Sequence, residues 1–205
     1  MSNEVLLAIV AAASGGIGWV GKFIKQYWEK KQIKKEHNEY INRLKAIADV
    51  YNSMDRLQSS ERIDRVFLLE ISNGGHSPRP GSKLYAKSIK ITLEERNFSK
   101  EELINMYEKL PLDYNYIQMI INAQQEGFYY FDTEKEKPCM LKSLYQNEGI
   151  QCSEIYHIHT DIDEEKMFIL SASTYNDPET FKGESFRAFL STEIMVIRSN
   201  FKRYR

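Results

Sequence analysis

The chain has 205 residues, of which 42% are hydrophobic and 28% charged, so it can bury a core and is not a globally disordered chain. Its net charge of −1 excludes a general nucleic-acid-binding protein. Its two cysteines, Cys139 and Cys152, lack metal-ligand spacing and indicate free thiols in a reducing compartment.

Residues 5–24, VLLAIVAAASGGIGWVGKFI, form the most apolar and glycine-rich stretch of the chain. No charged residue lies between Glu4 and Lys22, and a bilayer core is crossed by about 17–25 apolar residues. Small residues recur at a spacing that lets two helices approach closely in lipid: Ala8, Ala12 and Gly16. The stretch therefore predicts a single-pass transmembrane anchor over residues 1–24. The alternative is a hydrophobic helix that mediates oligomerisation or lies on a membrane surface.

A second interpretation of the same stretch is a strand followed by a phosphate-binding glycine loop. Residues 16–21 match G-x-G-x-x-G, and residues 16–22 match G-x-x-x-x-G-K. The second motif needs Ser or Thr after the lysine, where this chain has Phe23. The first motif needs a second strand, where this chain has the charged segment KKQIKKEHNEY. The context therefore favours the membrane helix.

The segment after the apolar stretch is strongly basic. Residues 22–45 hold eight lysine and arginine side chains against three glutamates. The positive-inside rule then predicts an inner-membrane protein with its C-terminal part in the cytoplasm. The same basic run is suited to contact anionic lipid headgroups.

Residues 25–58 contain no Pro or Gly and predict a basic amphipathic connecting helix. Apolar side chains, with one histidine among them, recur at alternating spacings of three and four: Ile33, His37, Tyr40, Leu44, Ile47, Tyr51 and Met54. This heptad pattern has two interpretations. It is either the face of one helix that lies on its own domain, or the seam of a parallel coiled coil that joins two subunits through residues 33–54.

The pattern of residues 59–205 predicts one α+β domain. It has a buried strand at 65–72, the turn-rich NGGHSPRPGS and a second strand at 84–93. Ser99 and Glu102 form a capping box that opens a helix through about residue 110. A helix at 114–125 follows and ends at Gly127, and after it come a short strand at 128–131 and a helical turn at 141–148 that ends at Gly149. The last elements are a hairpin of strands at 152–160 and 166–174 and a final helix capped by Asp177. This order indicates an antiparallel sheet with helices on one side.

Over roughly residues 35–203 the chain resembles a GAF/PAS-like sensor domain. The resemblance is carried by DRVFLLEISNGG at 64–75, by GIQCSEIYHIH at 149–159, and by FILSAS followed by a helix. It is most similar to membrane-anchored GAF-like proteins of bacteriophages. The resemblance implies a domain that binds a small ligand or only dimerises, and it transfers no ligand-contacting residue to this chain.

Two groups of residues are candidates for a site. The loop with Asn73, Gly74, Gly75, His76 and Arg79 combines exposed backbone N–H groups with a guanidinium, so it predicts an anion-binding site; the alternative is a solvated turn.

The other candidate is the pair His157 and His159 in H-x-H-x-D. Period-two spacing on a strand is expected to point both imidazoles to one face, as a shared metal would require. The usual further histidine ligands are missing, so we expect no metal site and no cofactor, and an exposed hairpin face instead.

Together these patterns predict a membrane-anchored, non-enzymatic sensor or interaction module that forms a homodimer and binds a small ligand or a protein partner, but no nucleic acid. The alternative is a holin-like or anti-holin-like membrane effector with one span and a folded extramembrane domain. A third hypothesis, an enzyme, would use the glycine loop or the histidine pair.

Overall fold

The computed structural model describes the backbone of four ranges, residues 3–73, 82–94, 98–181 and 183–203. Side chains are described within these ranges from residue 25 onward, except at positions 178, 180 and 203. The chain divides into two compact units, Met1–Lys45 and Ala46–Arg205.

The first element, α1, is a single helix over Asn3–Gln58. It confirms the helix predicted at 25–58 and continues it back through residues 5–24. The alternative of a strand and a glycine loop is wrong, because the glycines lie inside a helix. Each glycine costs a helix only about 1 kcal/mol relative to alanine, and no proline interrupts the surrounding apolar residues.

Among the residues described with their side chains, no helix is both long enough and apolar enough to cross a membrane. The span predicted at 5–24, including Ala8, Ala12 and Gly16, belongs to α1 but its side chains lie outside the described set. The membrane anchor therefore stays a prediction.

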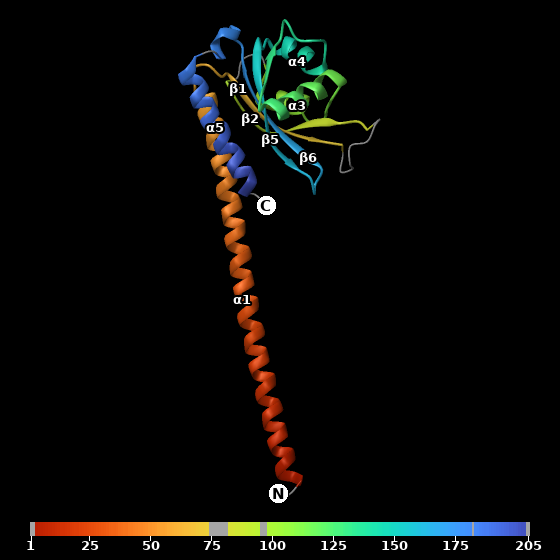
Figure 1. Cartoon of the computed structure of the whole chain (residues 1–205), viewed down its shortest axis with the longest axis vertical. Coiled ribbons are helices and arrows are strands. Elements are labelled where there is room, and N and C mark those ends of the chain that lie inside the picture. Colours follow the sequence, from red (N-terminus) through yellow and green to blue (C-terminus); the bar gives the residue numbers. More distant parts are fainter. Residues whose placement is uncertain (1–2, 74–81, 95–97, 182, 204–205) are drawn as a thin grey trace. The chain divides into compact units, whose positions relative to one another are not determined.

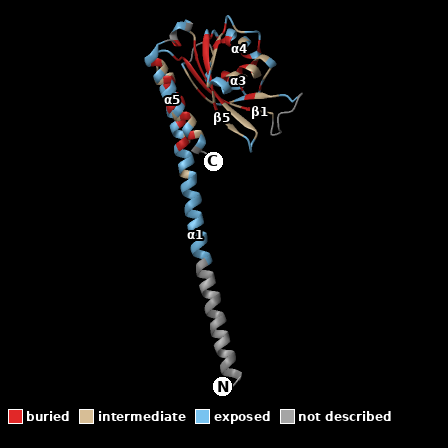
Figure 2. Ribbon diagram, in the orientation of Figure 1, coloured by how far each residue is buried: buried red, intermediate tan, exposed pale blue. Residues whose placement is uncertain are grey.

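The heptad face of α1 has two environments. Ile33, His37, Tyr40 and Leu44 are exposed, whereas Met54 is fully buried. The C-terminal turns of α1 bury a face of their own: Ala46, Val50, Ser53, Met54 and Leu57. Figure 2 shows this change from exposed to buried residues along α1. The interpretation that the helix lies on its own domain is therefore confirmed for residues 46–58, and the coiled coil stays a prediction for the exposed residues before them.

The second unit is built on one six-stranded sheet with the order β3-β2-β1-β6-β5-β4. Every neighbouring pair is antiparallel. The strands are β1 (Arg65–Ser72), β2 (Tyr85–Leu93), β3 (Leu110–Pro111), β4 (Tyr129–Asp132), β5 (Cys152–Asp161) and β6 (Lys166–Thr174). All five predicted strands are confirmed, and β3 is additional.

The helices of this unit start and stop at local signals. Ser99 and Glu102 form the predicted capping box before α2 (Lys100–Met106). Gly127 ends α3 (Tyr114–Glu126) and Gly149 ends α4 (Met140–Glu148), both with the positive φ that favours glycine. The helices α3 and α4 are confirmed at or near their predicted bounds, and α2 is confirmed at its predicted start.

Two predicted helix boundaries are wrong. The helix after Ser99 ends at Met106 rather than near residue 110, because Leu110–Pro111 pairs with β2 as β3. Asp177 does not open the final helix: it accepts a hydrogen bond from the N–H of Glu179 at the short 3₁₀ helix Pro178–Phe181. The final helix α5 covers Glu184–Arg203.

Helices cover both faces of the sheet, so the predicted one-sided arrangement is wrong. One core lies between the sheet and α2, α3 and α4. The other lies between the sheet and α5 with the C-terminal turns of α1, which run side by side in Figure 1. The physical reason is that the central strand β1 is buried on both faces, as its near-continuous apolar run RVFLLEIS requires.

Candidate functional site

The loop predicted to bind an anion follows β1. Asn73 lies at its start and is described, whereas Gly74, Gly75, His76 and Arg79 lie outside the described residues. The structure does not test this site, and the anion-binding loop stays a prediction.

The two histidines of H-x-H-x-D lie on β5, where a β-bulge separates them. His157 is opposite Ile169 on β6, and His159 is opposite Phe168. Directly opposed residues of an antiparallel pair point to the same face of the sheet. Ile169 belongs to the core under α2–α4, whereas Phe168 packs against the core under α5. The expectation of both imidazoles on one face is therefore wrong, because the extra residue Ile158 shifts the alternation.

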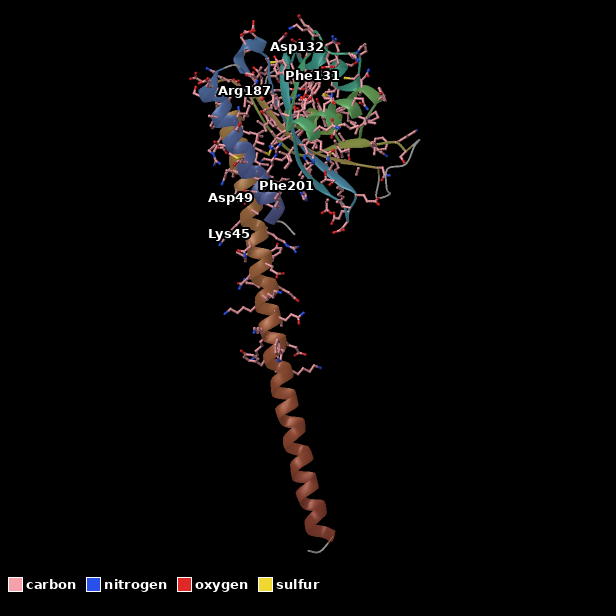
Figure 3. The ribbon with its side chains drawn as sticks, in the orientation of Figure 1. Lys45, Asp49, Phe131, Asp132, Arg187 and Phe201 are labelled. Atoms are coloured by element: carbon pink, nitrogen blue, oxygen red, sulfur yellow. The ribbon has the colours of Figure 1, made fainter. Side chains whose placement is uncertain are left out.

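The surroundings of the two imidazoles also differ. His157 Nε2 lies 2.9 Å from Thr160 Oγ1, and partial burial together with the nearby Arg198 guanidinium lowers the pKa of His157. The ring of His159 lies 6.5 Å from the ring of Phe201, a residue of α5 labelled in Figure 3. Within the described ranges, no group of three or more His, Cys, Asp or Glu residues is placed to hold a metal ion.

Both cysteines are buried free thiols. Cys139 is the N-cap of α4, where its Sγ accepts a hydrogen bond from the backbone N–H of Lys142 at 3.3 Å. Burial raises the pKa of Cys139, and it raises the pKa of Cys152 to about 11. Neither thiol has the lowered pKa that a nucleophilic cysteine needs.

A buried arginine marks a site that the sequence pattern missed. Arg65 begins β1 and is 0% exposed. It lies opposite Ser173 on β6, which in turn lies opposite Ser153 on β5. All three side chains therefore point to the face covered by α2, α3 and α4. We call this group the Arg65 cluster, with the members Arg65, Tyr107, Tyr145, Glu148, Ser153, Ser171 and Ser173.

Aromatic rings and one carboxylate surround the Arg65 guanidinium. Its Cζ lies 4.2 Å from the ring centroid of Phe67 and 5.0 Å from that of Tyr145. It forms an ion pair with Glu148 of α4, and the Tyr107 hydroxyl donates a hydrogen bond of 2.9 Å to the same carboxylate. Burial raises the pKa of Glu148, while the guanidinium and the Tyr107 hydroxyl oppose that rise. A buried charge is tolerated only with such partners.

Two polar atoms of the Arg65 cluster have no hydrogen-bond partner among the described residues. They are Arg65 Nε and Ser153 Oγ, and both residues are 0% exposed. The neighbouring hydroxyls are linked, since Ser173 Oγ lies 3.4 Å from Arg65 Nη2 and 3.2 Å from Ser171 Oγ. Buried polar groups are nearly always paired, with protein, water or ligand. A buried water or a small molecule with hydrogen-bond acceptors is the kind of partner that these two groups call for.

The sequence did contain one signal for this cluster. Arg65 opens a strand that its apolar run predicts to be buried on both faces, and a charge in such a strand needs a partner. The partner could not be found in the same way, because Glu148 lies 83 residues further along the chain on α4.

A second buried carboxylate lies on the opposite face of the sheet. Glu154 of β5 is 0% exposed and pairs with Arg187 of α5, which Figure 3 labels. The Tyr156 hydroxyl donates a hydrogen bond to the same carboxylate. The Arg187 side chain is 40% exposed, so this pair reaches solvent, unlike the Arg65 cluster.

No family model matches the sequence, and no curated protein matches it. Solved structures do match. The GAF domain of a two-component sensor histidine kinase from Bacillus halodurans has 10% identity and a TM-score of 0.52, over 76% of this chain and 92% of that chain. A GAF3 domain from Synechocystis in its photoproduct state has 13% identity and a TM-score of 0.52, over 78% and 93%.

A third similar structure is the phycocyanobilin-bound GAF domain of a cyanobacterial phytochrome, with 8% identity and a TM-score of 0.50 over 81% of this chain and 94% of that chain. The comparisons lend no support to the narrower resemblance to membrane-anchored bacteriophage proteins. At these identities the likeness is one of fold alone, and on that basis this chain has a GAF domain fold, an α+β domain with an antiparallel sheet between flanking helices.

Proposed function

We propose that the protein is a membrane-anchored, non-enzymatic sensor module whose GAF-like domain binds a small polar ligand at the Arg65 cluster. The observation that carries the proposal is a GAF domain fold whose interior holds a guanidinium N–H of Arg65 and the hydroxyl of Ser153, neither of which has a hydrogen-bond partner in the described part of the chain. Sensor kinase and phytochrome GAF domains of the same fold are in keeping with a sensing role.

The chemistry of the cluster sets the class of ligand. A guanidinium presents fixed N–H donors that match carboxylate, phosphate or carbonyl oxygens. The rings of Phe67 and Tyr145 add flat apolar surface beside it. We therefore expect a small ligand with an acceptor group and an apolar or aromatic body.

Anchoring rests on the sequence of residues 5–24 and on the basic segment that follows it. In this proposal the apolar segment holds the protein at the inner membrane, with the GAF-like domain in the cytoplasm. The narrower origin of the protein in bacteriophages has no further support and is not part of the proposal.

Native mass spectrometry of the full-length protein, purified in detergent from the cells that made it, tests ligand binding. We expect a bound small molecule that is released on denaturation. The double variant Arg65→Met with Glu148→Leu removes both charges without leaving one buried alone, and we expect it to lose the molecule. Lys87→Met on the exposed face of β2 serves as the control and should keep it. Wild-type protein that carries no bound molecule in any preparation would contradict the ligand site.

Cell fractionation tests the anchor. We expect the full-length chain in the membrane fraction, extracted by detergent and not by high salt, because a spanning segment is held by lipid rather than by charge. Protein that is soluble without detergent would rule the anchor out. Loss of membrane potential on induced expression would instead support the holin-like alternative.

A further inference from the structure

The exposed part of α1 carries an apolar stripe with no partner among the described residues of its own unit. Ile33, Tyr40 and Leu44 are 65%, 60% and 44% exposed, and His37 between them is exposed as well. We call these four residues the α1 seam. We propose that the seam is the contact surface for a second copy of this chain, paired in parallel and in register.

Polar and buried residues limit the seam at both ends. Continued toward the N-terminus, its next positions are Lys30 and Gln26, which do not form an apolar contact. Continued toward the C-terminus, it reaches the half-buried Ile47 and then Tyr51 and Met54, which pack in the core of the second unit. The available surface is therefore four positions long, and it stops before the residues that the domain uses itself.

One complementary charge pair supports a second copy as the occupant. With Ile33 and Tyr40 as d positions and His37 and Leu44 as a positions, Glu29 is a g position and Lys34 an e position. In a parallel pair, a g residue faces the e residue five positions further on in the other helix. Glu29 therefore meets Lys34 of the second copy, and two-fold symmetry provides this attractive pair twice.

His37 gives the pair its register. In the parallel arrangement the two His37 side chains face each other in one layer, and a single polar a position is known to favour one register over the alternatives. In an antiparallel arrangement His37 would face Tyr40 instead. The choice of parallel rests on the proposed function, since two chains anchored in one membrane run in the same direction.

The seam alone is short for a stable coiled coil. Two predicted spans held in one membrane raise the effective concentration of the two seams, so weak contacts suffice there. The seam then adds specificity to an association that the small residues of the span begin.

Disulfide cross-linking of the full-length chain tests the pairing. Single variants Ile33→Cys, His37→Cys and Leu44→Cys are expected to form disulfide-linked dimers under mild oxidation, because each residue meets its own copy. Lys35→Cys lies on the outer face of the helix and serves as the matched control. The wild type has both cysteines buried. It should therefore form no disulfide-linked dimer and run as a monomer on a non-reducing denaturing gel.

Charge variants provide a second readout. Lys34→Glu should weaken association roughly fivefold, since two exposed attractive pairs become repulsive. Adding Glu29→Lys to that variant should restore it. Equal cross-linking of Lys35→Cys and His37→Cys would overturn the parallel seam. So would disulfides that form only when His37→Cys is mixed with Tyr40→Cys. Cross-linking with the expected pattern in protein that is soluble without detergent would uphold the seam while refuting the anchor.

Discussion

Arg65 and Glu148 are two buried residues whose charges need partners inside the domain. Both are almost fully buried, at 0% and 1% exposure, and they lie on different elements, β1 and α4. A buried ion pair adds little net stability, but removal of one partner leaves an uncompensated charge in the core. The packing of α4 on the sheet is therefore expected to be sensitive to the loss of either partner.

Glu148→Leu alone should lower the free energy of unfolding by about 3–5 kcal/mol, since it leaves the Arg65 guanidinium buried without a counter-charge. The double variant Arg65→Met with Glu148→Leu should recover most of that loss. Urea titration followed by near-UV circular dichroism measures both. If the double variant is as unstable as the single one, the pair is not the cause.

His157 makes the stability of the domain depend on pH. Its pKa is lowered in the folded state by partial burial and by Arg198, so the unfolded chain binds the proton more readily. The stability that depends on neutral His157 is thus fully present above about pH 6.5, the unfolded value, and is lost as pH falls through the folded pKa.

From pH 7.5 to pH 5, the midpoint of urea unfolding should therefore fall further for the wild type than for His157→Asn. Lys87→Met, which changes an exposed side chain of β2, is the control and should keep the wild-type fall. An unchanged pH dependence in His157→Asn would mean that other groups cause it.

At the scale of elements, α1 is one helix with two kinds of surface. The turns before Lys45 expose their apolar side chains, whereas Val50, Met54 and Leu57 complete a core with α5 and the sheet. An apolar stripe has the same appearance in a sequence whether its partner is the same chain or a second copy.

Met54→Ala should lower the stability of the domain by about 2–5 kcal/mol, because it opens a cavity in a packed core. Leu44→Ala, in the exposed part of the same helix, should change it by less than about 0.5 kcal/mol. Chemical denaturation of the two variants under one set of conditions makes the comparison. Equal effects would show that the C-terminal turns of α1 are not part of the core.

At the scale of the whole molecule, the sheet links the two cores. Ile169 and Leu170 are neighbours on β6, both 0% exposed, and they point into opposite cores. Since both cores pack against the same sheet, we expect a loss of packing in one core to destabilise the other core as well.

Ile169→Ala and Leu170→Ala should each lower the unfolding midpoint of the domain by an amount equivalent to about 2–5 kcal/mol, in a single transition. Far-UV and near-UV circular dichroism should give coincident curves for both variants. Separate transitions for the two signals would indicate that the two faces unfold independently.

The sequence by itself determined the elements whose signals are local. The Ser99–Glu102 capping box, the stops at Gly127 and Gly149, and the apolar run of β1 are each visible within a few residues of the sequence. The GAF-like order of helices and strands followed from them. Membrane anchoring and the anion-binding loop are still predictions.

Only the tertiary structure decided which faces those elements bury and which distant side chains meet. The bulge at Ile158, which separates His157 from His159, arises from pairing with β6 and breaks the period that a strand would otherwise keep. Arg65 meets Glu148 across 83 positions because the sheet and α4 are packed together. Neither outcome is encoded in a local pattern, since each depends on the register and packing of segments far apart along the chain.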